Sequence, residues 1–206
     1  MVDQMDFGDI SDVPDVTDSG QVDDALSDAF DQDITQVGAT DISNFTESGL
    51  TDSNTVAAYI TANIPAEHLE GLDSIEYVND PAAYQDGLQG MWESDPWTGE
   101  TGIDVFPHDS QNELFDTVAH EIGHNAEAVM LQQNPDMIDQ WNDLYGASAA
   151  TYNASGGEQN EFVSPYARTS PEEDFAESYA TFINDPALLQ AASPDKYDFM
   201  AENVFD

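Results

Sequence analysis

The chain has 206 residues and a mass of 22.5 kDa, enough for one domain with its own hydrophobic core. It contains 43 acidic and only 2 basic residues, so its formal net charge is -41. Neutralising phosphate groups requires Lys and Arg, so this composition excludes a protein that binds nucleic acid or an anionic membrane. Hydrophobic residues make up 40% of the chain, which favours a packed core over an acidic disordered protein.

The charge also predicts the conditions under which the chain folds. Carboxylates on all sides of a small domain repel one another across a Debye length of about 8 Å at physiological salt, which shrinks to about 3 Å at 1 M salt. We therefore expect a protein adapted to high salt, from a halophilic organism or its virus. Aspartate outnumbers glutamate and Lys196 is the single lysine, which fits this interpretation.

Targeting signals and cysteines are both missing from the sequence. Residues 1–10 have neither the basic nor the apolar segment of a signal peptide, and no run of residues reaches the length of a membrane span. We therefore expect a soluble protein, in the cytoplasm of a high-salt organism or in a virus particle. The lack of cysteine excludes a disulfide framework, a cysteine nucleophile and a cysteine zinc site.

Composition divides the chain near residue 51. Residues 1–50 are rich in Asp, Ser, Thr and Gly with little apolar periodicity, which predicts an acidic N-terminal arm, extended or partly disordered, with a possible role in docking to a larger assembly. We expect residues 51–206 to form one domain. Its first helix begins with Thr51 or Ser53 as the N-cap and ends near Pro65.

Two strand patterns follow, at residues 74–78 and 103–106. The segment between them, residues 87–102, is rich in Gly, Trp and Pro. It is either an irregular loop with buried aromatic side chains or the edge strand and rim of a substrate cleft. A long helix then begins with Asp109 or Ser110 as its N-cap and ends at about residue 132.

The chemical signal lies in that long helix, in the sequence His120-Glu121-Ile122-Gly123-His124. Histidines four residues apart lie on one helix face about one turn from each other, so both imidazoles can reach a single metal ion. Glu121 lies on the same turn and is placed to accept a proton from a water molecule activated by that metal. His108, in the turn before the helix, is interpreted as a loop histidine.

A second long helix supplies candidates for a third ligand. The sequence predicts a helix over residues 137–145, followed by a flexible connection over residues 146–160. Ser170-Pro171 then marks the start of a second long helix, which ends near Asn184. A catalytic zinc needs three protein ligands, and no histidine follows the motif, so a carboxylate must serve.

Three carboxylates compete for that place. Glu173 and Glu177 lie four residues apart on one helix face, so that one can bind the metal while the other hydrogen-bonds a ligand histidine. Asp143, in Asn142-Asp143-Leu144-Tyr145-Gly146, is the alternative, although it stands one position away from the register of aspartate-zinc proteases.

With Tyr166 seven residues before Glu173, inside residues 162–177, the chain resembles the zincin metallopeptidases. The resemblance is to the gluzincins related to the catalytic domain of anthrax lethal factor and to the proline-specific clostridial endopeptidases, and it covers about residues 103–184. In that group a Tyr precedes a Glu ligand by seven residues, and the Glu lies in a helix containing Phe-Ala-Glu. The roles that the resemblance implies are His120, His124 and Glu173 as zinc ligands, Glu121 as general base, Tyr166 as oxyanion donor, and Glu177 as hydrogen-bond partner of a ligand histidine.

The same resemblance implies an α+β fold for residues 51–206, in which a small twisted sheet packs on the motif helix and on a second helix that bears the Glu ligand. It implies a zinc-dependent endopeptidase that hydrolyses peptide bonds of protein or peptide substrates. The alternative function is a structural or adaptor protein of a halophilic assembly, such as a virus particle, that keeps this fold without general turnover.

Overall fold

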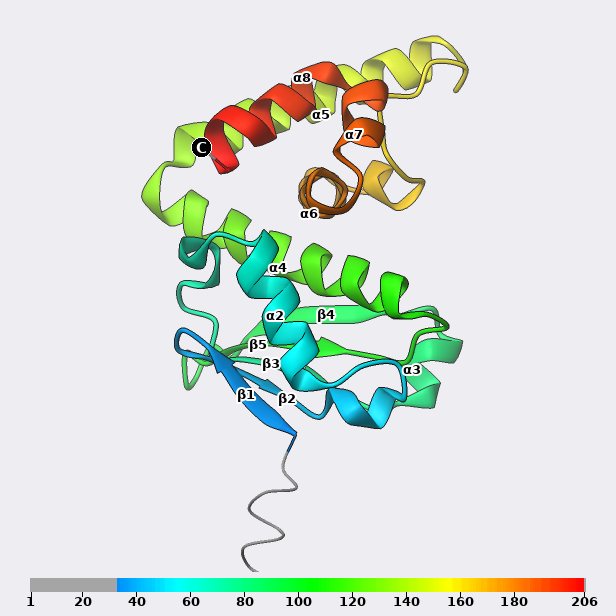
Figure 1. The fold of residues 1–206 in the computed structure, drawn as a ribbon. Coiled ribbons are helices and arrows are strands. Elements are labelled where there is room, and N and C mark those ends of the chain that lie inside the picture. Colours follow the sequence, from blue (N-terminus) through cyan, green and yellow to red (C-terminus); the bar gives the residue numbers. More distant parts are fainter. Residues whose placement is uncertain (1–32, 206) are drawn as a thin grey trace, which may run out of the picture. The chain divides into compact units, whose positions relative to one another are not determined.

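The computed structural model of the chain describes residues 33–205, which form a mixed α and β unit with a five-stranded sheet (Figure 1). The strands are β1 (Ile34–Val37), β2 (Thr40–Ser43), β3 (Ser74–Tyr77), β4 (Gly90–Ser94) and β5 (Thr101–Val105). The α-helices are α2 (Ser53–Asn63), α3 (Pro81–Gln85), α4 (Gln111–Gln133), α5 (Pro135–Ala154), α6 (Pro171–Asn184), α7 (Pro186–Ala192) and α8 (Pro194–Phe199). Short helical turns are η1 (Phe45–Ser48), η2 (Ala66–Leu69), η3 (Tyr166–Arg168) and η4 (Met200–Val204).

The sheet has one apolar and one polar face. Its strand order is β1-β2-β3-β5-β4, with β2, β3 and β5 parallel and the two outer strands antiparallel to their neighbours. The register places Ile42, Ile75 and Ile103 side by side, and all three are fully buried. Successive side chains alternate between the faces, so Glu76 and Asp104 lie together on the opposite, polar face.

Helices α2 and α4 cover the apolar face of the sheet. α2 contacts β1 and β2, while α4 contacts β4 and β5. Val56 and Ile60 of α2 and Leu114 and Val118 of α4 are fully buried in the same core. The other side of α4 packs against α6, with α5, α7 and α8 beyond it (Figure 1). Helix α4 therefore lies between the sheet and the C-terminal helices, and has a different partner on each side.

Side-chain caps fix where α4 and α6 begin. The Ser110 hydroxyl accepts a hydrogen bond of 3.3 Å from the backbone N–H of Glu113, and the Ser170 hydroxyl accepts one of 3.2 Å from that of Glu173. Pro171, which has no N–H to satisfy, occupies the first turn of α6. The predicted starts of both helices are confirmed, with Ser110 rather than Asp109 as the cap of α4.

The folded unit begins earlier in the chain than residue 51, where the arm was expected to end. Residues 34–48 already contain β1, β2 and η1. Each strand has only four residues, and β2 pairs with β3 about thirty residues later, so no local periodicity reveals the pairing. Asp33 ties the segment to α2 by accepting a 3.0 Å hydrogen bond from the Ser53 N–H. Residues 1–32 of the predicted arm lie outside the described residues, and the docking role expected of the arm stays a prediction.

Three further elements refine the sequence prediction. Residues 90–94 form an edge strand rather than part of an irregular loop. Helix α5 continues to Ala154 instead of ending at residue 145, because the alanines and other small residues after Gly146 sustain a helix. Asp52 caps α2, between the two residues expected to do so. Within residues 33–205, no helix combines the length and the apolar character needed to cross a membrane.

Candidate metal centre

Helices α4 and α6 meet at small residues, which brings their polar side chains together. His120, Gly123 and His124 lie on the face of α4 that meets α6, where Glu173 and Ala176 face them. A Cβ atom added to Gly123 would lie 3.1 Å from the Cα atom of Ala176, so a side chain there would push the two helices slightly apart. This close approach sets both histidines opposite the glutamate.

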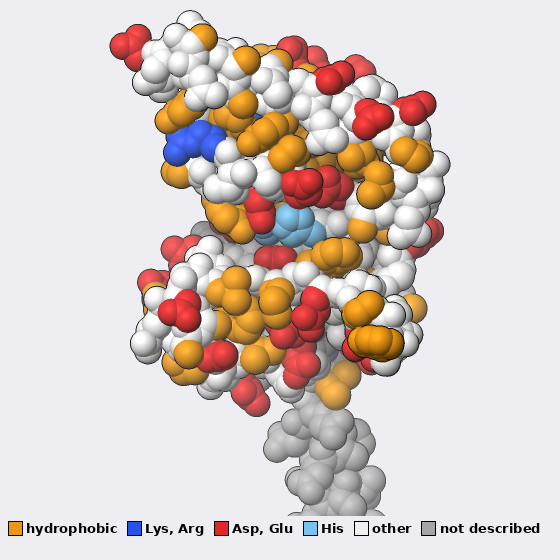
Figure 2. Space-filling view, turned by 180° about the vertical axis from the view of Figure 1, so that it is seen from behind, with side chains coloured by type: hydrophobic (Ala, Val, Ile, Leu, Met, Phe, Trp, Pro, Cys, Tyr) orange, Lys and Arg blue, Asp and Glu red, His pale blue; other side chains and the backbone are white. Residues whose placement is uncertain are grey.

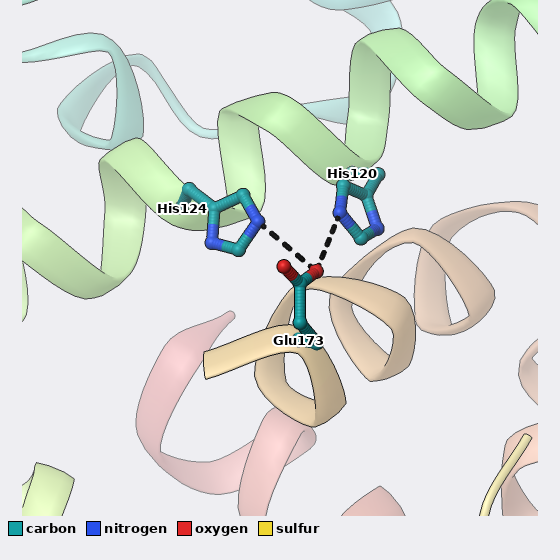
Figure 3. A group of neighbouring side chains, drawn as sticks. All are labelled: His120, His124 and Glu173. Atoms are coloured by element: carbon teal, nitrogen blue, oxygen red, sulfur yellow. Dashed lines mark ion pairs between the residues drawn. The ribbon is translucent and has the colours of Figure 1, made fainter. Parts of the chain in front are cut away.

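One ligand atom of each of three residues points to a common place between the helices (Figure 3). The Nε2 atoms of His120 and His124 lie 3.2 Å and 3.5 Å from Oε2 of Glu173, and the three residues' ligand atoms lie within 4.8 Å of one another. Tetrahedral zinc with bonds of about 2.0–2.1 Å holds its ligand atoms about 3.3 Å apart. The two distances from the histidines to Oε2 of Glu173 are close to this value.

A buried oxygen at the centre of the cluster also indicates a site that could bind a metal ion. Oε2 of Glu173 is inaccessible to solvent and has no aligned hydrogen-bond donor among the described residues, although both imidazoles are close. A buried carboxylate oxygen without a hydrogen bond is costly unless a cation compensates for it. Short contacts that are poorly aligned for hydrogen bonding are the arrangement expected of atoms that share a metal ion.

Glu177 and Tyr166, the other two residues that the sequence associated with the site, each contact one residue of this cluster. Oε1 of Glu177 lies 3.0 Å from Nδ1 of His120, the ring nitrogen that faces away from Glu173, although the pair is not aligned for a hydrogen bond. The hydroxyl of Tyr166 donates a 2.8 Å hydrogen bond to Oε1 of Glu173, and its side chain is half exposed. The structure thus brings Tyr166 and Glu177 to the residues with which the sequence associates them.

The turn that carries Tyr166 depends on Ser164, a residue that the sequence reasoning missed. Its hydroxyl accepts hydrogen bonds from the backbone N–H groups of Tyr166, at 3.1 Å, and Ala167, at 3.0 Å. Burial would raise the pKa of Glu177, but its interactions with His120 and the Ser164 side chain lower it. The signal in the sequence is a serine just before a proline, a pattern typical of side-chain-capped turns.

The electrostatics of the cluster favour a positive charge between the helices. Burial alone would lower the pKa of His120, but the nearby carboxylates of Glu173 and Glu177 raise it to about 9. Burial alone would raise the pKa of Glu173, but His120, His124 and Tyr166 hold it far below its usual range. Because the charged form is favoured on both sides, a proton and a metal ion compete for the same place.

Glu121 is almost completely buried, with 6% of its surface exposed, and it borders the same space as His120. Burial raises the pKa of its carboxyl, while the charges of His120 and His124 and the backbone N–H of Trp92 oppose that rise. A carboxylate with a raised pKa is a better proton acceptor, which is the property that a general base needs.

A cleft of about 760 Å³ opens beside the cluster. His120 and Glu121 of α4 line it together with Gly90 of β4, Tyr166, and the C-terminal half of α6 that includes Thr181. Figure 2 shows this hollow with histidine side chains at its base and acidic side chains above and below them. Residues 87–90, at one end of the segment for which the sequence left a cleft rim as one alternative, belong to its lining.

Other candidates lie outside the cluster. Asp143, the alternative ligand, is exposed on α5 and is not among the residues gathered around the two histidines. His108 is occupied by two contacts, from Nδ1 to the Phe106 carbonyl oxygen at 2.6 Å and from Nε2 to the Thr117 hydroxyl at 2.8 Å. These contacts fit the structural role expected of a loop histidine.

Glu127 is a second residue that the sequence reasoning missed. It lies one turn after His124 on α4, and burial raises its pKa to about 7, with the charge of His124 opposing and those of Glu172 and Glu173 adding to the rise. Its spacing of three residues from His124 is the signal that places it on this face. It adds a further acidic group beside the cluster.

A family model described as "Putative zinc-binding metallo-peptidase" matches residues 108–201, which include the whole cluster and Glu121. No curated protein matches the chain. The fold is similar to a crystal structure from Bacteroides caccae ATCC 43185 whose description uses the same words, with a TM-score of 0.42 and 16% sequence identity. The match covers 70% of this chain and 61% of that one, so the chain spans less than two thirds of its neighbour's length. Both the matching family model and the neighbouring structure are described as zinc-binding metallopeptidases.

Proposed function

We propose that the chain is a zinc-dependent endopeptidase of the zincin type that hydrolyses peptide bonds in protein or peptide substrates. The observation that carries this proposal is the convergence of His120, His124 and Glu173 on one place, beside the buried carboxylate of Glu121 and an open cleft. The description of the family that matches residues 108–201 supports zinc as the metal and hydrolysis of peptide bonds as the reaction.

In this proposal His120, His124 and Glu173 hold the ion, as three protein ligands do in catalytic zinc sites. Bound zinc would polarise the scissile carbonyl and lower the pKa of water. Glu177, 3.0 Å from Nδ1 of His120, fixes the orientation of that ring and makes it a stronger ligand. The excess of acidic residues over the whole chain draws cations toward the cluster.

The proton transfers fall to Glu121 and the charge stabilisation to Tyr166. Glu121 accepts a proton from the attacking water and then delivers it to the leaving amine. Tyr166 exchanges its hydrogen bond to Glu173 for one to the scissile carbonyl oxygen, where negative charge develops. A donor of this kind is worth about 10²- to 10³-fold in rate. The exposed position of the Tyr166 side chain at the cleft allows this exchange.

The sheet edge supplies a place for the substrate backbone. Within residues 33–205, β4 is an outer strand that pairs with β5 alone, and it begins at the cleft with Gly90. An extended peptide can pair with the free N–H and C=O groups of such an edge while its side chains enter the neighbouring cleft. A cleft that is open to solvent fits an endopeptidase, which must admit a chain that continues past the cut on both sides.

The test is the cleavage of a diverse peptide mixture, followed by mass spectrometry, for zinc-loaded wild type and zinc-loaded Glu121→Gln in multimolar KCl. Glu121→Gln keeps the shape of the side chain and removes its basicity, so we expect cuts with the wild type alone. Equal cutting by both proteins would contradict the proposal. Bound zinc without any cutting would favour a structural or adaptor protein that keeps the fold.

We also propose that this enzyme works in high salt, inside a halophilic organism or a virus particle. The support is the formal net charge of -41, which in dilute buffer acts against the compact state. Circular dichroism during dialysis from 3 M to 0.1 M KCl, concentrations chosen for the test, should show loss of helix at about 0.1 M. An unchanged spectrum would contradict the salt adaptation and leave the peptidase proposal intact.

A further inference from the structure

The first residue of β4, Gly90, lies directly against the side chain of Glu121. A Cβ atom added at position 90 would be 2.5 Å from Oε1 and 2.8 Å from Cγ of Glu121, and 2.7 Å from Cγ2 of Thr117. Carbon and oxygen atoms that are not bonded stay more than about 3 Å apart. The Glu121 side chain therefore occupies space that any other residue type at position 90 would need.

Backbone conformation does not explain this glycine. Gly90 is not among the glycines with positive φ, so its backbone is open to other residues. A glycine inside a strand weakens the strand, and it often marks a place where another group approaches closely. Here the approaching group is the carboxylate of Glu121.

The surroundings of this contact are anchored on both sides. Gly90 pairs with β5, and the Phe106 N–H donates a 2.9 Å hydrogen bond to the carbonyl oxygen of the preceding residue, Gln89. On the helix side, the Thr117 hydroxyl contacts Nε2 of His108 at 2.8 Å, and the other ring nitrogen of that histidine contacts the Phe106 carbonyl oxygen. Among the groups at this contact, the flexible Glu121 carboxylate is the one most free to move.

We propose that Gly90 is a positioning residue for Glu121, because the space that its missing side chain leaves determines where the carboxylate rests. The inference rests on the proposed function, in which Glu121 is the general base. A reacting group displaced by about 1 Å can lose about 10²-fold in rate, so a single methyl group at position 90 is expected to matter.

The kinetic test compares Gly90→Ala with wild type in the full, zinc-loaded chain. We expect kcat to fall about 10- to 100-fold, with KM within about threefold and zinc content unchanged. Gly102→Ala is the matched control, on the paired strand β5, where the added Cβ meets only the Ser74 hydroxyl at 3.2 Å and its carbonyl oxygen at 4.0 Å. Gly90→Ala with the wild-type rate, or an equal loss in both variants, would overturn the inference.

Crystal structures supply a readout that does not depend on activity. In Gly90→Ala the Glu121 carboxylate should move by about 1 Å or more from its wild-type position while the backbones of β4 and α4 superpose. A carboxylate in its wild-type position would overturn the inference. If the wild type cleaves no peptide, the proposed function fails, and this comparison still decides what Gly90 does.

A double variant tests the crowding directly. Thr117→Ser removes the Cγ2 methyl group that the new Cβ would meet at 2.7 Å and keeps the hydroxyl that contacts His108. In the Gly90→Ala background this change should restore part of the lost rate and part of the carboxylate's position. If the double variant is no faster than Gly90→Ala and Glu121 is equally displaced, crowding of the new Cβ against Thr117 is contradicted.

Discussion

Two adjacent carboxylates of α6 point in different directions and have different partners. Asp174 is fully buried, and its two oxygens lie 2.8 Å and 2.9 Å from Nζ of Lys196, the single lysine of the chain. Glu173 faces α4, where it meets two imidazoles and, among residues 33–205, no permanently charged side chain. The chain completes one of these clusters with its own cation, while the other has the composition of a site for a cation from solution.

The ion pair of Asp174 and Lys196 serves packing rather than chemistry. Burial raises the pKa of Asp174 to about 6 against the pull of Lys196, and burial lowers the pKa of Lys196 against the pull of Asp174. Lys196 also donates to the Glu161 carbonyl oxygen at 3.2 Å and lies over the Phe162 ring. It thereby joins α8, α6 and the segment that leads to the turn of Tyr166.

The largest expected effect comes from removing the carboxylate charge on the metal side. Glu173→Gln should lower kcat/KM by about 10³-fold or more, equivalent to about 4 kcal/mol, because it weakens a zinc ligand and leaves the fold alone. Zinc titration and peptide cleavage measure the two parts of this loss. Glu172→Gln, one residue earlier and exposed, is the control and should match wild type. Similar losses in both variants would indicate a general charge effect.

On the structural side, Lys196→Met should destabilise the metal-free protein by about 3–5 kcal/mol, because it leaves the Asp174 charge buried without a partner. The cost should persist in 3 M KCl, since salt screens buried pairs weakly. The double variant Lys196→Met/Asp174→Leu should recover most of the loss in denaturant unfolding.

The other basic residue provides the comparison for that experiment. Arg168 donates to the Tyr152 hydroxyl and stacks on the same ring near the surface. Arg168→Met should cost about 1 kcal/mol or less. A loss for Lys196→Met no larger than this would contradict the structural role of the buried pair.

The sequence predicts the cluster around Glu173 better than it predicts the ion pair of Asp174 with Lys196. The motif of α4 and the cap of α6 are local patterns, and a helix converts the spacing of His120 and His124 directly into a shared face. The roles expected of Tyr166 and Glu173 came instead from the resemblance to the zincin metallopeptidases, since Tyr166 lies outside α6. Pairing of Asp174 with Lys196 joins residues 22 positions apart across three helices, and no local pattern indicates it. Gly90 was missed for the same reason, since its neighbour Glu121 is brought to it by tertiary packing.

A smaller effect is expected where the two helices cross. Gly123→Ala would place a Cβ 3.1 Å from Cα of Ala176 and 3.2 Å from Cβ of Tyr179, so we expect a loss of about 1–3 kcal/mol in stability and weaker zinc binding as α6 moves away. Gly146→Ala in α5 meets no atom within 4 Å and should be neutral or stabilising by up to about 1 kcal/mol. Unchanged zinc affinity in Gly123→Ala would contradict the claim that this crossing sets the cluster.

The smallest effect concerns His68, a buried histidine that forms no ion pair with a carboxylate within residues 33–205. Burial lowers its pKa, while Glu67 and a backbone contact at Val204 oppose the shift, and Nδ1 lies 2.8 Å from the Tyr179 hydroxyl. The unfolded state then binds a proton that the folded state resists, so stability is complete above about pH 6.5 and falls as the pH drops below it.

The slope from His68 cannot exceed about 1.4 kcal/mol per pH unit, since one proton is involved. Denaturant unfolding of wild type and His68→Gln between pH 7.5 and 5.5, a range chosen for the test, isolates this term from the titration of the carboxylates. We expect the wild type to lose more stability than the variant over that range. Parallel curves would show that His68 does not titrate differently in the folded state.

The central claim is that His120, His124 and Glu173 bind one zinc ion. The most direct measurement is a crystal structure of the zinc-loaded full chain with anomalous diffraction recorded at the zinc absorption edge. The account predicts a single strong peak about 2.0–2.2 Å from Nε2 of both histidines and from a carboxylate oxygen of Glu173. A peak elsewhere, or none in protein saturated with zinc, would contradict it.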